Sequence, residues 1–240
     1  MSKEIMVMDV RAYPVKENGQ GLLANAIVNI GTKEGAMVAI NNVTLRQVKK
    51  DDKTYTFVDL PRRQLKDREG NPLKDENGHN QYAEYVSFKV DDEKHPGLGD
   101  KIRNLISNEV RKAYENCKDG QEYGESKRET DFVIDPDRVS AYTRTEKSPA
   151  SVYIGNVMRI DNVYVNEKDG QKHISMPYEK YEQEGESKYR SLVSPVQKGL
   201  ASKILDAVEK ARTRVPAQKE VSEEQEQDAL DGANLEGDER

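Results

Sequence analysis

The chain has 240 residues, of which 34% are charged, with a formal net charge of −6, no Trp and a single Cys. This length fits one or two domains, and no apolar stretch approaches the roughly 18 residues that a membrane-spanning helix needs. The first 30 residues are too polar for a secretory signal, and Cys117 alone forms no internal disulfide. We therefore expect a soluble cytoplasmic protein.

The first third of the chain predicts β-strands. Apolar and other residues alternate strictly over residues 22–30, which is typical of a half-buried strand. Further strands are predicted at residues 41–45 and 56–60, where alternate residues share one face. Pro61 ends the last of these strands because proline cannot donate to a sheet ladder. Turn-forming residues then crowd between residues 69 and 78 and indicate a surface hairpin.

Two amphipathic helices are predicted. Apolar residues keep helical spacing from Ile102 to Ala113 and again from Leu200 to Ala211. Asp100 or Gly99 is the expected cap of the first helix. The segment Gly97-Leu98-Gly99 lacks the third glycine of a phosphate-binding loop, so it indicates only a turn at the start of the helix. Residues 116–130, rich in charge, are expected to form a linker.

The chain also repeats itself, with five short blocks recurring in the same order. The matched pairs are residues 25–31 (NAIVNIG) with 149–155 (PASVYIG), 40–43 (INNV) with 160–163 (IDNV), 58–61 (VDLP) with 174–177 (ISMP), 85–88 (YVSF) with 189–192 (YRSL), and 101–102 (KI) with 203–204 (KI). The offset between copies only falls along the chain, so the first copy is the longer one. The largest step coincides with the turn-rich residues 69–78, where a surface hairpin tolerates insertion. This order favours an internal duplication over chance similarity between strands.

The end of the chain differs in charge from the rest. Residues 216–240 hold nine acidic and two basic residues, a net charge of −7, which leaves 36 basic and 35 acidic residues, a net charge of +1, in residues 1–215. Few large apolar residues and strong self-repulsion predict a disordered tail. Such a tail either only solvates the protein or imitates nucleic acid and competes for a basic face of the same chain.

The order of these features resembles the SpoVG (stage V sporulation protein G, septation regulator) family. The resemblance is carried by Asp9-Val10-Arg11 in the first strand, an alanine-rich strand, a strand that ends in proline, an aromatic-led segment and a Lys-Ile helix. The second copy matches from Ala150 to Ala211 and the first from Ile5 to about Glu115. The resemblance thus covers about 195 of the 240 residues.

This resemblance implies an α+β protein with two similar domains, each an antiparallel sheet followed by a helix. The expected organisation is domain 1 at residues 1–115, the linker at 116–130, domain 2 at 131–215 and the disordered acidic tail at 216–240. Members of the family dimerise partly through sheet pairing, so two copies imply self-association or an intramolecular pseudo-dimer that covers the sheet edges. The second copy opens with residues 133–137 (VIDPD) in place of the usual basic strand, and this is its least typical part.

SpoVG proteins are similar to DNA-binding and RNA-binding regulators, so the resemblance implies that DNA, RNA or both are the partners. Affinity for nucleic acid comes largely from Lys and Arg near phosphates. The candidate phosphate contacts are Arg62, Arg63, Lys66, Arg68, Lys101, Arg103, Arg111, Lys112, Lys198 and Lys203. Tyr55 and Phe57 are placed to stack on bases if their strand face is open. The alternative is an ordinary solvated surface, because acids such as Asp67 interleave with these bases.

The two copies differ at the loop that follows the strand-ending proline. The first copy has Pro61-Arg62-Arg63, whereas the second has Pro177-Tyr178-Glu179, which places an acid at this position. If this loop contacts phosphate, the second copy is the weaker binder.

Nothing in the sequence favours catalysis. The three histidines are far apart, and neither a metal-binding spacing nor a nucleophile motif is present. We therefore expect a non-enzymatic, nucleic-acid-binding regulator without metal, cofactor, small-molecule substrate or membrane contact. The alternative is a protein–protein interaction module of the septation or sporulation pathway that acts through sheet edges and the acidic tail.

Overall fold

The computed structural model describes residues 3–16, 21–88, 96–183 and 185–214. Most of these residues lie in antiparallel β-sheets, and two α-helices, α1 (Leu98–Glu115) and α2 (Leu200–Arg212), accompany the sheets. The protein is therefore α+β and rich in sheet, as expected. The acidic tail at residues 216–240 lies outside the described residues.

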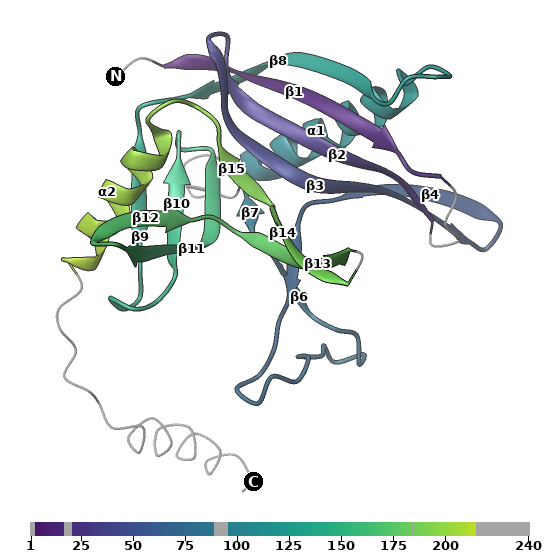
Figure 1. Ribbon diagram of the computed structural model, residues 1–240. Helices are drawn as coiled ribbons and strands as arrows, with labels where there is room; N and C mark the ends of the chain where they lie inside the picture. Colours follow the sequence, from purple (N-terminus) through teal and green to yellow (C-terminus); the bar gives the residue numbers. More distant parts are fainter. Residues whose placement is uncertain (1–2, 17–20, 89–95, 184, 215–240) are drawn as a thin grey trace, which may run out of the picture.

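The first sheet has the strand order β15-β3-β2-β1-β8, and β4 pairs with β3 beyond this path. Its strands are β1 (Glu4–Pro14), β2 (Leu22–Thr32), β3 (Gly35–Lys50), β4 (Lys53–Asp59), β8 (Gly124–Ile134) and β15 (Val193–Pro195). The alternation predicted for β2 is confirmed, because Ala24, Ala26, Val28 and Ile30 are all buried. Helix α1 packs against β1, β8 and β2, as Figure 1 shows.

The second sheet has the order β12-β11-β10-β9, and β7 also pairs with β11. Its strands are β7 (Val86–Ser87), β9 (Val139–Tyr142), β10 (Ala150–Ile154), β11 (Met158–Lys168) and β12 (Gln171–Ser175). Helix α2 packs against β9, β12 and β10 (Figure 1). Each helix thus covers the sheet built mainly from its own half of the chain.

Two short strands cross between the halves. Strand β7 lies in the first half of the sequence, yet Val86 pairs with Ile160 in β11 of the second sheet. Conversely, β15 lies in the second half, and Val193 pairs with Ile40 in β3 of the first sheet. The sequence comparison aligned residues 85–88 with 189–192, and this alignment is wrong by three residues, because Val86 and Val193 occupy the corresponding places beside Ile160 and Ile40.

Two further ribbons complete the fold. Strands β5 (Arg62–Gln64) and β6 (Tyr82–Glu84) pair with each other, as do β13 (Tyr178–Gln183) and β14 (Glu186–Ser191). We call residues 62–84 the first arm and residues 178–191 the second arm. The first arm projects from the body of the molecule beyond β6 (Figure 1). The predicted surface hairpin at residues 69–78 is therefore confirmed as part of this arm.

The helices begin and pack largely as their sequences indicate. The predicted apolar face of α1 is buried, with Ile102, Ile106, Val110 and Ala113 inside. The N-cap is Gly97, with φ 73°, and neither Asp100 nor Gly99 takes that place. Glycine adopts this left-handed conformation without steric cost. Helix α2 begins in the same way after Gly199, with φ 82°.

The segment between the halves is more ordered than its composition indicated. Of residues 116–130, expected to be a linker, residues 124–130 belong to β8, which pairs with β1 along the edge of the first sheet. Residues 133–134, expected to open the second domain, also end β8. The strand beside β10 is instead β9, where Val139 pairs with Ile154. Charged residues on β8 misled the prediction because an edge strand keeps one side in solvent.

Candidate nucleic-acid interface

The first arm carries four of the predicted phosphate contacts. Arg62 and Arg63 lie in β5 and are exposed, and Lys66 and Arg68 lie further out and are exposed as well. The acids that interleave with them serve the turns, because the Asp67 carboxylate accepts the backbone N–H groups of Glu69 and Asn71 at 2.9 and 2.8 Å. The bases of the arm therefore do not form ion pairs with Asp67 among the described contacts.

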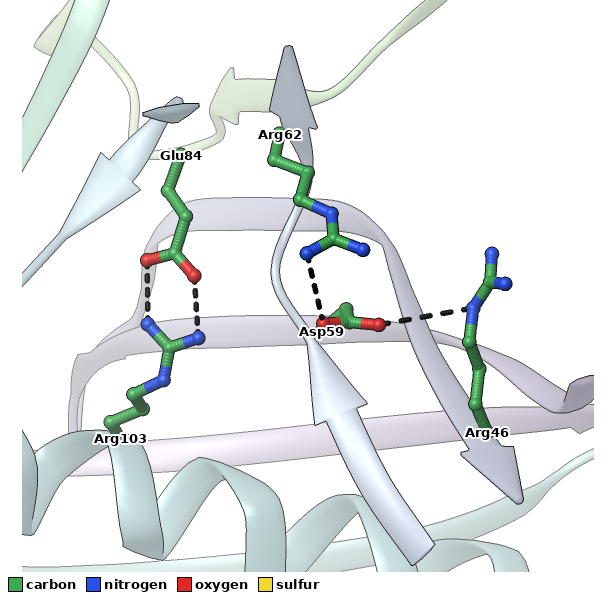
Figure 2. A network of polar contacts seen from close by, with 5 residues as sticks. All are labelled: Arg46, Asp59, Arg62, Glu84 and Arg103. Atoms are coloured by element: carbon green, nitrogen blue, oxygen red, sulfur yellow. Dashed lines mark hydrogen bonds and ion pairs between the residues drawn. The ribbon is translucent and has the colours of Figure 1, made fainter. Parts of the chain in front are cut away.

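Arg62 lies within a small polar network at the base of the arm. Its guanidinium group stacks over the Tyr82 ring, 4.7 Å from the ring centroid, and Nη1 lies 3.6 Å from Asp59 Oδ1. On the other side of Asp59, Arg46 Nε lies 3.8 Å from Oδ2. Figure 2 shows the two arginines flanking this single carboxylate. Two cations thus share one anion, which leaves a local excess of positive charge.

This network lines a surface hollow of about 330 Å³, which we call the first hollow. Its walls are Asn42, Thr44, Arg46, Asp59, Leu60, Pro61, Arg62 and Tyr82. Strands β3 and β4 supply four of these residues, Arg62 and Tyr82 come from the first arm, and Leu60 and Pro61 connect β4 to the arm. The hollow combines a cationic wall with an aromatic ring at its edge.

The open face of β3 and β4 extends this hollow. Thr44 pairs with Asp59, Arg46 with Phe57 and Val48 with Tyr55, so all six side chains lie on one face of the ribbon. Tyr55 is 52% exposed and Phe57 38%. The condition set for base stacking, an open strand face, is therefore met.

Helix α1 bears four other predicted phosphate contacts. Two of them, Arg103 and Arg111, form hydrogen bonds within the protein. Arg103 donates to both carboxylate oxygens of Glu84, at 2.6 and 2.5 Å (Figure 2). This hydrogen-bonded pair raises the pKa of Arg103 above its ordinary value. Arg111 donates to the backbone carbonyl oxygen of Thr56 at 2.9 Å. Lys101 and Lys112 are exposed on α1.

The remaining two predicted contacts belong to the second half. Lys198 is exposed just before α2, and Lys203 on α2 donates to Asp137 Oδ1 at 2.8 Å. This contact lowers the pKa of Asp137 below its ordinary value, first through the hydrogen bond and then through the charge of Lys203. The ten residues therefore do not gather in one cluster. They divide among the first arm, α1 and the neighbourhood of α2.

A second hollow, of about 410 Å³, lies at the matching place in the other half. It is lined by Asn162, Tyr164, Asn166, Ser175, Met176, Pro177 and Tyr178. Each of these residues follows a residue of the first hollow by 120 positions (in β11) or 116 positions (from β12 to the second arm). Where the first hollow has two arginines and an aspartate, the second has Asn166, Tyr178 and Ser175 and no charged residue.

A side chain of the first hollow contacts the second arm. Asn42, a wall of the first hollow, donates to Oε2 of Glu179, the residue that follows Tyr178. Glu179 also accepts a hydrogen bond from Arg190 Nε at 2.5 Å. Tyr85 lies half-buried nearby, and burial raises its pKa, while the charges of Arg63 and Glu179 act on it in opposite directions. Glu179, the acid that distinguishes the loop of the second copy from that of the first, is thus hydrogen-bonded to Asn42 and Arg190.

Sequence reasoning missed Arg46, Tyr82 and the whole second hollow. The signal for Arg46 was its strand position, since it alternates with the buried Leu45 beside the open face of Phe57. The second hollow could have been found by placing the residues of the repeat side by side, because every wall residue except Asn166 lies in or next to a matched block.

Comparison of the chain with models of known protein families, with curated proteins and with solved structures found no match. Neither helix in the described ranges is long and apolar enough to cross a membrane. Within the same ranges, no three His, Cys, Asp or Glu side chains gather as metal ligands would.

Proposed function

We propose that the chain consists of two SpoVG-like units that arose by duplication and form an intramolecular pseudo-dimer. The register of the central strands supports this. Ala26 pairs with Val43 and Val28 with Ile40, so β3 has one extra residue in a bulge, and the same bulge separates the pairs Ala150–Val163 and Val152–Ile160. The bulges contain Asn42 and Asn162, with φ of 56° and 69°.

The exchange of β7 and β15 supports the same proposal. The backbone N–H of Asn41 donates to the Leu192 carbonyl oxygen at 2.8 Å, and that of Asp161 donates to the Tyr85 carbonyl oxygen at 2.9 Å. Each unit thus extends the other's sheet with a strand. A tandem protein of this kind covers within one chain the edges through which separate subunits would pair.

We propose that this protein is a non-enzymatic regulator that binds nucleic acid. The observation that carries the proposal is the first hollow, where Arg46 and Arg62 share Asp59 beside the exposed rings of Tyr55, Phe57 and Tyr82. Arginine at a phosphate and aromatic rings at bases are the two elements by which proteins bind nucleic-acid strands. Arg63, Lys66 and Arg68 on the first arm extend the cationic surface.

The test is the salt dependence of binding in an Arg46→Ala, Arg62→Ala double variant. Loss of two phosphate contacts should weaken binding for every sequence and reduce the slope of log K against log salt by about 1.4 for a single strand and about 1.8 for duplex DNA. The matched control is Lys33→Ala with Lys127→Ala, which removes two exposed cations at the turn before β3 and on β8. Binding would be measured at a low and a high salt concentration. Equal binding by the parent and the Arg46/Arg62 variant at both concentrations would contradict the proposed interface.

Titrations with and without residues 216–240 address the tail and the alternative function. Stronger binding after removal of the tail would favour an imitation of nucleic acid, and unchanged binding a solvating role. Binding by neither form would favour a protein–protein interaction module instead.

A further inference from the structure

The second hollow is lined by residues that correspond to those of the first, but it has a different chemistry. Thr44, Arg46, Asp59 and Arg62 of the first hollow correspond to Tyr164, Asn166, Ser175 and Tyr178 of the second. The three charged residues of the first hollow correspond to neutral ones in the second, and two of the four corresponding residues, Tyr164 and Tyr178, are aromatic. A phosphate in the second hollow would meet no cation from its walls, so the occupant must be of another class.

Exposed rings surround the second hollow. Tyr164 is 40% exposed, Tyr178 51% and Tyr189 63%. The rings of Tyr178 and Tyr189 meet edge to face, with centroids 5.5 Å apart, which holds both in place while much of their surface remains in solvent. Flat, ordered and exposed rings of this kind are platforms on which nucleobases stack.

The polar walls fit the edges of a base. Asn162 and Asn166 each offer an amide that both donates and accepts hydrogen bonds, and Ser175 adds a hydroxyl group. The Tyr164 hydroxyl lies 3.5 Å from Asn162 Oδ1. Amides pair with the donors and acceptors of a base edge in the same way as another base would.

Cations lie at the edge of this hollow rather than inside it. Lys168 shares the strand face of Tyr164 and Asn166 on β11, and Lys180 shares that of Tyr178 on β13, and both are exposed. Glu179 and Arg190 pair with each other on the opposite face of the second arm. A nucleotide whose base lies in the hollow would thus have its phosphates near Lys168 or Lys180.

We propose that the second hollow binds an unpaired nucleobase, so that the protein selects single-stranded over duplex nucleic acid. This inference rests on the proposed function and names its ligand more closely. In a duplex each base is stacked and paired, and neither its faces nor its pairing edge can enter the hollow. The second arm, which supplies Tyr178, also contacts the first hollow through the hydrogen bond from Asn42 to Glu179.

The first test uses a fluorescent reporter, because the chain contains no Trp. In a Tyr178→Trp variant the only indole lies at the second hollow, and in a Tyr142→Trp control it lies on β9. We expect a single-stranded oligonucleotide to quench the first variant and leave the second unchanged. An abasic strand of the same length, which has the phosphates without the bases, should quench neither.

The second test measures affinity with single-stranded DNA, RNA of the same sequence, the DNA duplex and the abasic strand. The parent should bind the single strand more tightly than the duplex or the abasic strand. Replacement of both Tyr164 and Tyr178 by Ala should lower affinity for the single strand about tenfold or more and leave the abasic strand unaffected. Replacement of both by Phe keeps the stacking surface and should retain most of the preference. Comparison of DNA with RNA shows which of the two the protein binds more tightly.

The outcomes separate the two proposals. Equal affinity of the parent for the normal and abasic strands, or a preference for duplex, would overturn this inference and leave the proposed function standing. Failure of the parent to bind any of the four probes would overturn both.

Discussion

At the scale of single residues, the most demanding environment is that of Glu109. Its side chain is only 3% exposed, between α1 and β8. The Ser126 hydroxyl donates a hydrogen bond to Oε2, and Arg128 Nη1 donates to Oε1 at 3.3 Å. A carboxylate buried in this way is tolerated because both oxygens have partners. The ion pair between Glu109 and Arg128 also explains how the charged strand β8 can lie against α1.

We predict that Arg128→Ala lowers the free energy of unfolding by about 1–3 kcal/mol, because it leaves a buried carboxylate with one partner fewer. The control is Arg11→Ala, whose partner Glu125 is exposed, and which should change stability much less than Arg128→Ala does. Urea titrations give both values. Adding Glu109→Gln to Arg128→Ala should recover part of the loss, and a further loss of similar size would contradict this account.

At the scale of elements, the first arm is held by its turns more than by a core. The Asp67 carboxylate closes one turn through the backbone N–H groups of Glu69 and Asn71, and Asp75 closes the next through those of Asn77 and His79. The backbone hydrogen bond from Asn71 is the main reason that the pKa of Asp67 lies below its ordinary value. The arm is thus shaped by two aspartate side chains that accept backbone hydrogen bonds.

We predict that the turn at Asp67 loosens in acid. A carboxylate whose pKa is lower in the folded state adds stability above its unfolded pKa, and this contribution is lost as the pH falls through the folded value. The amide NMR shift of Asn71 should therefore follow a titration whose midpoint lies below 3.8, the ordinary value. In Asp67→Asn this step should disappear. A midpoint at or above 3.8 in the parent would contradict the role of the hydrogen bonds.

At the scale of the whole molecule, the exchanged strands tie the two sheets together. Val86 and Val193 are both fully buried, and each lies in the sheet of the opposite half. β7 is also close in sequence to α1, as β15 is to α2. A loss of packing at either valine should therefore lower the stability of both halves.

We predict that Val86→Ala and Val193→Ala each lower stability by about 2 kcal/mol, and that the loss is equal in α1 and α2. Hydrogen exchange of the two helices measures this, because elements of one cooperative unit open together. Val196→Ala, at an exposed position just after β15, is the control and should have little effect. Loss of protection in only one helix would mean that the halves unfold independently.

The parts of this fold that sequence could predict are those with a local cause. The alternation of β2, the apolar face of α1 and the turns of the first arm each depend on neighbouring residues. The exchange of β7 and β15 could not be predicted in this way, because each strand is only two or three residues long and its partner is distant in sequence. The edge position of β8 depends likewise on β1, more than a hundred residues earlier.

The candidate site was predicted in part for the same reason. Residue type identified Arg62 and the exposed rings of Tyr55 and Phe57, but it could not tell that Arg103 is bound by Glu84. Nor could it tell that Arg46 and Asp59 meet across β3 and β4. Charge is visible in a sequence, whereas the partner that neutralises it depends on the fold.

That both hollows belong to one chain has a consequence for recognition. In a dimer of identical subunits every substitution occurs twice, and the two ends of the assembly read a ligand alike. In this chain the corresponding positions can differ, as Arg62 in the first hollow and Tyr178 in the second do. A substitution therefore changes one hollow and leaves the other as it is. A strand that spanned both hollows would therefore contact a different set of side chains at each of its ends. If a strand binds both hollows as proposed, turning it end for end would exchange the two environments that its ends contact.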